Sequence, residues 1–185
     1  MSENIMDDVE IKQMNDYALS KWVNEQQVLN SATQYNTKSV RVRLFNTYGP
    51  GEYYSPYRSV ICLFIYKALH NITYNVYKGH KRTSTYITDC AKTLSNISEN
   101  FIPGMVYNIG GTDYHDIETA SSLILQATGK SENDLVRYKD SEILTTKHKI
   151  VDSTAAIRDL KHNSSVDLHE GIKMTVDWAK KIYKI

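Results

Sequence analysis

Tyr17 and Lys21 are the two residues of this sequence whose types and spacing are best suited to catalysis. They stand four positions apart in a stretch that we predict to be helical, so both side chains fall on one face of the helix. An ammonium group beside a phenol favours the phenolate and lowers the tyrosine pKa from about 10, which lets the tyrosine exchange a proton with a substrate hydroxyl. Many helices contain this spacing by chance, so a surface pair without a catalytic role is the competing interpretation.

The loop Asn46-Thr-Tyr-Gly-Pro-Gly51 is a second candidate, because it directly follows a predicted strand. Open α/β sheets bind ligands at the carboxyl ends of their strands, where amide and hydroxyl groups suit a polyhydroxylated ligand. An ordinary turn explains the same residues equally well.

Arg58 and Arg82 are candidates for binding phosphate, because a guanidinium presents a planar fork of hydrogen-bond donors. Most single arginines are solvated surface charges, which is the alternative for each. Among the 14 tyrosines, Tyr53, Tyr54 and Tyr57 lie near the same loop. Their rings can stack on a base or a sugar, or they can simply fill a tyrosine-rich core and surface.

Several other chemistries lack their motifs. The sequence contains no His-Glu-x-x-His, Cys-x-x-Cys, Gly-x-Ser-x-Gly or Walker phosphate loop, and its six histidines are scattered. We therefore predict no metal site. The two cysteines, Cys62 and Cys90, are too few for a disulfide framework, which indicates a reducing compartment.

Composition narrows the class of protein further. The chain has 22 Lys+Arg against 21 Asp+Glu and a formal net charge of +1, which gives no general attraction to nucleic acid or to anionic lipid. The longest apolar run, residues 60–66, is far shorter than the roughly 20 residues that a membrane-spanning helix needs. Without a secretory signal at the N-terminus, we expect a soluble, cytoplasmic protein that binds neither nucleic acid nor membrane.

The elements that must position the candidate residues follow from hydrophobic periodicity and from capping residues. Residues 1–13 look loose. Asp116 and Asp152 are predicted to cap helices, and Gly129 to end one. Helices are expected at 14–34, 57–70, 89–97, 116–128, 153–160 and from 168 onward, and strands at 39–45, 73–77, 83–87, 105–109 and 135–138. Strands separated by helices favour a mixed α/β fold with a partly parallel sheet covered by helices.

An ordered set of short motifs resembles the C-terminal half of the extended short-chain dehydrogenase/reductase family, the NAD-dependent nucleotide-sugar epimerases and dehydratases. Each piece is weak alone, and the set covers residues from about 15 to the C-terminus. The likeness is greatest to dTDP-glucose 4,6-dehydratases and UDP-sugar 4-epimerases. The motifs are Tyr17-x-x-x-Lys21, Arg43-Leu-Phe-Asn-Thr-Tyr-Gly-Pro50, Tyr77-Lys-Gly, Arg82 with Tyr86-Ile-Thr-Asp89, Tyr107-Asn-Ile-Gly-Gly111, and Glu170-Gly-Ile with Trp178.

The resemblance implies a role for each matching position. Tyr17 would be the catalytic tyrosine, Lys21 would hold the nicotinamide ribose of NAD, and Thr47 would lie beside the cofactor. The partner would be a nucleoside-diphosphate sugar. Residues implied to contact it are Asn46, Ser59, Val60, Asn75, Tyr77, Arg82 and Asn108. Two further substrate-binding candidates are Arg58, for its guanidinium, and Lys147, which with Thr146 replaces an Asp-Arg pair that often contacts the nucleotide in the family.

The sequence also departs from the family pattern. No glycine precedes Gly49, so the Gly-x-x-Gly-x-x-Gly turn that binds the NAD pyrophosphate is absent, and NAD binding by this chain alone is doubtful. The resemblance thus implies that 14–185 is a C-terminal part lacking the dinucleotide-binding half. That part would hold the last strands of a Rossmann-like parallel sheet and a small α/β substrate-binding domain.

Two further expectations follow from the missing half. Its absence would leave strand edges open, which favours a homo-oligomer or a separate chain that supplies that half. We expect the isolated chain to be inactive, or alternatively to be a non-catalytic nucleotide-sugar-binding or interaction module.

Overall fold

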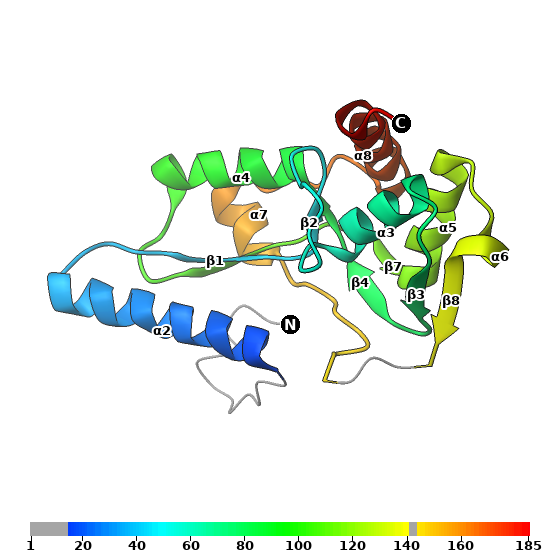
Figure 1. Ribbon diagram of the computed structural model, residues 1–185. Coiled ribbons are helices and arrows are strands. Elements are labelled where there is room, and N and C mark those ends of the chain that lie inside the picture. The colour runs from blue at the N-terminus through cyan, green and yellow to red at the C-terminus, as the bar shows by residue number, and fades with distance from the viewer. Residues whose placement is uncertain (1–14, 141–143) are drawn as a thin grey trace.

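Two groups of short strands, each covered by helices, make up the part of the chain that the structure describes (Figure 1). The computed structural model describes residues 15–140 and 144–185. The segment 1–13, which we predicted to be loose, lies outside these residues. The observed order of strands and helices confirms the predicted mixed α/β class.

The first group contains the parallel pair β1 (Arg41–Leu44) and β6 (Val106–Ile109), in which Arg41 lies opposite Val106. Strand β2 (Thr47–Tyr48) follows β1 directly in the chain and forms a second parallel pair with β5 (Thr85–Tyr86). Helix α7 (Thr154–Leu160) packs against β6, and α4 (Ile87–Asn100) packs against α7. They enclose a small core of Tyr107, Ala155, Ala156 and Leu160.

The second group contains the parallel pair β3 (Tyr74–Tyr77) and β8 (Val136–Lys139) and the antiparallel pair β4 (Lys81–Thr83) and β7 (Tyr114–Asp116). Helices α3 (Val60–Leu69), α5 (Ile117–Thr128) and α8 (Leu168–Tyr183) pack on one another, and the short α6 (Glu132–Leu135) precedes β8. Their facing side chains form the main core, which includes Phe64, Val76, Ile124, Ile172 and Val176.

Helix α2 (Asp16–Tyr35) lies apart from both cores, alongside β1 (Figure 1). The Asn15 side chain caps it by accepting a hydrogen bond from the amide of Ala18 at 2.9 Å, and Asn36 ends it in the left-handed conformation. None of its 20 residues is buried. Glu25 ties the helix to β1, because its carboxylate accepts two hydrogen bonds of 2.7 Å from the Arg43 guanidinium.

Some element boundaries differ from those predicted, for local reasons. Helix α3 begins at Val60 and not at 57, because Ser59 caps it. The predicted strand 83–87 is divided into β4 and β5, and Ile87 already begins α4. Asp116 precedes α5 but makes no capping hydrogen bond, since its carboxylate pairs with the Lys81 ammonium at 3.3 Å.

The other predicted cap is displaced by one position. Asp152 precedes the N-cap residue Ser153 and accepts a hydrogen bond of 3.0 Å from the amide of Thr154. Gly129 ends α5 with a φ of 68°, as its position in the sequence predicted. Among residues 15–140 and 144–185, no helix combines the length and the apolar character that crossing a membrane requires.

Candidate functional site

Tyr17 and Lys21 share one face of α2, as their spacing predicted. The Lys21 ammonium nitrogen lies 5.2 Å from the centre of the Tyr17 ring, close enough for the cation to interact with the aromatic face. The Tyr17 side chain is 72% exposed, and Lys21 is exposed beside it. Both groups are therefore accessible to a ligand or to another part of a larger assembly.

The packing of α2 on β1 brings this pair to the end of β1 where the candidate loop begins. Glu25 contacts Arg43, which lies three residues before Asn46, a distance of about 10 Å along extended chain. Tyr17 lies eight residues before Glu25, about 12 Å back along the helix. Because α2 and β1 run in opposite directions, the start of α2, which carries Tyr17, and the end of β1, which precedes Asn46, lie toward the same end of this unit (Figure 1).

The Asn46 loop is ordered by specific contacts. Asn46 has a φ of 44°, its side-chain amide donates to the Thr83 carbonyl at 2.8 Å, and its own carbonyl accepts from the amide of Thr85 at 3.3 Å. The Thr47 hydroxyl contacts the Cys90 sulfur at 3.8 Å. These contacts join the end of β1 to β5, so the loop is fixed against the neighbouring strand.

Gly49 is required where it stands. Its φ is 143°, and a Cβ atom there would collide with the Ile87 side chain at the start of α4. The loop therefore packs closely against α4 because residue 49 lacks a side chain.

Arg58, Ser59 and Val60 lie where this loop enters α3. The Ser59 hydroxyl caps the helix by accepting from the amide of Cys62 at 3.2 Å, Val60 packs against the main core, and the Arg58 side chain is exposed. Of the three, Arg58 is the one free to meet a ligand in solvent.

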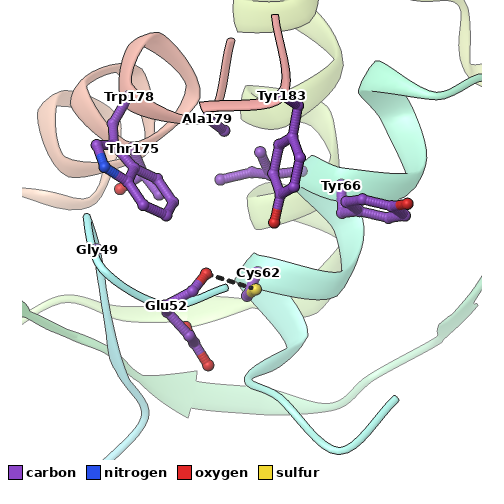
Figure 2. A pocket seen from close by; sticks show the side chains of 9 residues that line it. Gly49, Glu52, Cys62, Tyr66, Thr175, Trp178, Ala179 and Tyr183 are labelled. Carbon is purple, nitrogen blue, oxygen red and sulfur yellow. Dashed lines mark hydrogen bonds between the residues drawn. The ribbon is translucent and has the colours of Figure 1, made fainter. Parts of the chain in front are cut away.

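A cavity beside this loop is too small for a substrate. Gly49, Glu52, Cys62, Trp178 and Tyr183 are among the residues that line it (Figure 2). Its volume of ≈ 10 Å³ holds about one water molecule. Burial raises the pKa of the Cys62 thiol to about 12, so this cysteine is an inert packing residue.

Arg82 and Lys147, two predicted ligand residues, are brought together through the backbone. The Arg82 guanidinium donates to the carbonyls of Lys81 at 2.8 Å and of Lys147 at 2.9 Å. The Arg82 side chain is buried and holds the segment around Lys147 against β4, whereas the Lys147 side chain is exposed.

Asn75 and Tyr77 occupy the face of β3 opposite to the buried Tyr74 and Val76. The Tyr77 ring lies 5.9 Å from the ring of His80, and the His80 Nδ1 atom lies 3.4 Å from a nitrogen of Arg82. Tyr77 and Arg82 are thus connected through His80, a link that the sequence motifs did not predict.

Asn108 lies in β6, opposite Arg43 of β1. It is fully buried in β6, and its side-chain amide donates to the Asp152 carbonyl at 2.9 Å. This contact ties β6 to the segment before α7, so Asn108 has a structural role in the chain as described.

Sequence reasoning missed the residues of β8 that face the predicted ligand residues. Arg137 lies opposite Asn75, and Lys139 lies opposite Tyr77, with both cations exposed. The pairing of β3 with β8 spans some 60 positions, and no local signal in the sequence reports it.

A buried pair of side chains was also missed. The Ser84 hydroxyl and the Nε2 atom of His115 are 2.9 Å apart, and the His115 Nδ1 atom donates to the Asp116 carbonyl at 3.0 Å. Burial lowers the pKa of His115, so the imidazole is neutral and Nε2 accepts the hydrogen bond from Ser84. In the described residues, no three His, Cys, Asp or Glu side chains gather to hold a metal ion.

Residues 2–110 match the family model described as "NAD dependent epimerase/dehydratase family". The chain is 28% identical over 173 residues to the UDP-N-acetyl-alpha-D-glucosaminuronate decarboxylase of Bacillus cytotoxicus, covering 90% of this chain and 53% of that protein. The chain spans about half the length of the curated relatives it matches.

Solved structures with the same fold include two epimerases. The UDP-glucuronic acid 4-epimerase of Bacillus cereus, in complex with UDP-glucuronic acid and NAD, superimposes with a TM-score of 0.85 at 25% identity, over 99% of this chain and 57% of that one. An epimerase of Methanothermobacter thermautotrophicus gives a TM-score of 0.87 at 23% identity, over 97% and 54% of the two chains. The fold of this chain is therefore the Rossmann-like α/β fold of these proteins.

Proposed function

Because this chain belongs to the NAD dependent epimerase/dehydratase family, we propose that it is the C-terminal, substrate-binding portion of a nucleotide-sugar epimerase or dehydratase and carries its catalytic tyrosine. One observation supports this role above the others: Tyr17 and Lys21 lie together and exposed near the start of α2, toward the same end of the unit as the end of β1. In this proposal residues 14–185 lack the dinucleotide-binding half.

Tyr17 and Lys21 suit the nicotinamide end of NAD, because both side chains are exposed and neither is buried in the core. The Lys21 ammonium would hold the ribose and favour the Tyr17 phenolate, and Tyr17 would then exchange a proton with a sugar hydroxyl. Thr47 would lie beside the cofactor. NAD, when bound, supplies the redox chemistry by taking a hydride from the sugar and later returning it.

A nucleoside-diphosphate sugar is the proposed substrate. Exposed or half-exposed positions supply its direct contacts: the Arg58 guanidinium and the Lys147 ammonium suit the diphosphate, and Asn75 and Tyr77 suit the base. Asn46, Ser59, Val60, Arg82 and Asn108 are held by contacts within the chain, so their proposed role is to shape the site.

The pyrophosphate of NAD needs a glycine-rich turn from elsewhere. A separate chain, or another part of a longer one, would supply it, and an isolated chain would be inactive. Within the described residues, β1 pairs with β6 on one edge only, and α2 exposes Trp22, Val23 and Val28. An open strand edge beside an apolar helix favours association, in a homo-oligomer or with the dinucleotide-binding half.

Calorimetry on the purified chain tests the proposal. We expect UDP-glucose or dTDP-glucose to bind, whereas NAD⁺ alone should not bind. Arg58→Ala should weaken binding of the sugar nucleotide by about tenfold. Arg58 is preferable to Arg82 as the test, because Arg82→Ala would also detach the segment around Lys147. If the chain binds none of UDP-glucose, dTDP-glucose, UDP and dTDP, the proposal is wrong.

A non-catalytic nucleotide-sugar-binding module is the second candidate, because the exposed Arg58 and Lys147 and the β3 residues Asn75 and Tyr77 suit a sugar nucleotide without NAD. Adding a dinucleotide-binding half from a relative distinguishes the two candidate functions. If the chain is part of an enzyme, we expect turnover that depends on both chains. If it is a binding module, we expect it to bind a sugar nucleotide without turnover.

A further inference from the structure

We infer that Glu52 is a positioning residue that fixes Arg58 in the geometry needed to bind the nucleotide part of the substrate. This inference rests on the proposed function, and it assigns a role to a residue that no motif in the sequence singled out. Glu52 lies in the loop between β2 and α3, six residues before Arg58.

The Glu52 carboxylate closes this loop at its far end. One oxygen accepts the amide of Ser59 at 2.8 Å, and the other accepts the Ser59 hydroxyl at 2.7 Å. Hydrogen bonds to an ionised acceptor are roughly twice as strong as neutral ones. Glu52 and Ser59 together therefore fix the entrance to α3, and a carboxylate is also favoured by the helix dipole there.

Helices α8, through Trp178 and Tyr183, and α3, through Tyr66, hold the same loop from the other side. The amide of Tyr54 donates to the Tyr183 hydroxyl at 3.0 Å, and the Tyr54 ring stacks on that of Tyr66 with centroids 3.8 Å apart. The Tyr53 ring meets Trp178 edge to face at 5.5 Å. Figure 2 shows Glu52 on the loop with Trp178 and Tyr183 reaching toward it from α8.

The part of the loop between these anchors projects into solvent. The Tyr57 side chain is 96% exposed, and the Arg58 side chain is exposed although its amide is held by the Ser55 carbonyl at 3.2 Å. A cation on a fixed loop binds a phosphate without first losing the freedom of a mobile segment. The anchoring contacts thus pre-organise an outward guanidinium, and Glu52 acts through Arg58 with no need to touch the ligand.

Calorimetry with UDP and with dTDP on the full 185-residue chain tests this role. Glu52→Gln keeps the size of the side chain but leaves one oxygen where two accepted hydrogen bonds, and we expect the dissociation constant to rise about fivefold. If Glu52 acts through Arg58, the same change adds little once Arg58→Ala is present, because the two effects are coupled. Glu99→Gln, an exposed residue of α4, is the matched control and should leave binding unchanged.

Trypsin cleavage after Arg58 gives a second measurement that needs no ligand. Glu52→Gln should speed this cleavage, whereas the control Glu99→Gln should leave the cleavage rate unchanged. If Glu52→Gln does not fold, Tyr183→Phe replaces it, because the ring stays and the acceptor for the Tyr54 amide is lost. We expect this variant to weaken nucleotide binding about twofold, and to have no further effect when Arg58→Ala is present.

The outcomes separate the two proposals. If the wild-type chain binds neither nucleotide, the proposed function fails and the role of Glu52 fails with it. If the wild-type chain binds but Glu52→Gln binds equally well, or weakens binding just as much in the Arg58→Ala background, the inference about Glu52 alone is wrong.

Discussion

Helices α2 and α8 both carry large apolar residues, yet only α8 buries them. In α8 the apolar stripe of Leu168, Ile172, Val176 and Ala179 completes the main core with α3 and α5. In α2 none of the 20 residues is buried, and Trp22, Val23 and Val28 remain exposed.

The two helices therefore contribute differently to the described fold. The α8 stripe stabilises the main core of the described residues, whereas α2 contributes no buried side chain to either core. Changes in α8 should therefore reduce stability, and changes in α2 should reduce function.

Tyr17→Phe should have the largest effect, and on activity only. With the dinucleotide-binding half supplied from a relative such as the Bacillus cereus epimerase, removing the phenolic hydroxyl should lower turnover by about 10²–10⁴-fold, the usual contribution of an acid–base group. The melting temperature should stay the same because the Tyr17 side chain is 72% exposed. Turnover is measured by product formation from UDP-glucuronic acid or dTDP-glucose. If the Tyr17→Phe protein is as active as the wild type, Tyr17 is not the catalytic tyrosine.

Ile172→Ala should have the next largest effect, and on stability. Its side chain is 1% exposed in the main core, so the cavity should lower the free energy of unfolding by about 3 kcal/mol. Trp22→Ala in α2 is the matched comparison, and it should change that free energy by no more than about 0.5 kcal/mol. Chemical denaturation of the isolated chain measures both, and similar losses would show that α2 belongs to the same cooperative core.

The smallest effect concerns pH and again separates the two regions. Burial holds the pKa of His115 below that of the unfolded chain, so the unfolded state binds a proton more readily. Stability from this group is therefore present above about pH 6.5 and is lost as the pH falls below that value. In His115→Gln the free energy of unfolding should decrease less as the pH falls than in the wild-type chain. In Trp22→Ala the dependence of this free energy on pH should be unchanged. An unaltered slope in His115→Gln would contradict the assignment.

Local features of the sequence were sufficient to predict most elements. The Tyr17 and Lys21 spacing placed both side chains on one helix face, and the end of α5 at Gly129 followed from the need for a left-handed residue there. Both depend on interactions within about four positions of the chain, which a sequence reports directly.

The contacts of the predicted ligand residues could not be derived in the same way. Contact of Arg82 and Asn108 with a ligand stays a prediction, and the sequence did not indicate that both are buried and donate to the backbone carbonyls of Lys147 and Asp152. Whether a polar side chain meets solvent or another segment depends on chain that is distant in sequence.

The sequence by itself determined the class of fold, the helical pair Tyr17 and Lys21, and the order of motifs, because each is written in short-range spacing. Only the tertiary structure decided that Glu52 closes the Arg58 loop, that Arg137 and Lys139 lie beside Asn75 and Tyr77, and that α2 buries none of its side chains. These features arise where segments far apart in the chain meet, and pairing of that kind is set by packing of the whole molecule and not by any local pattern.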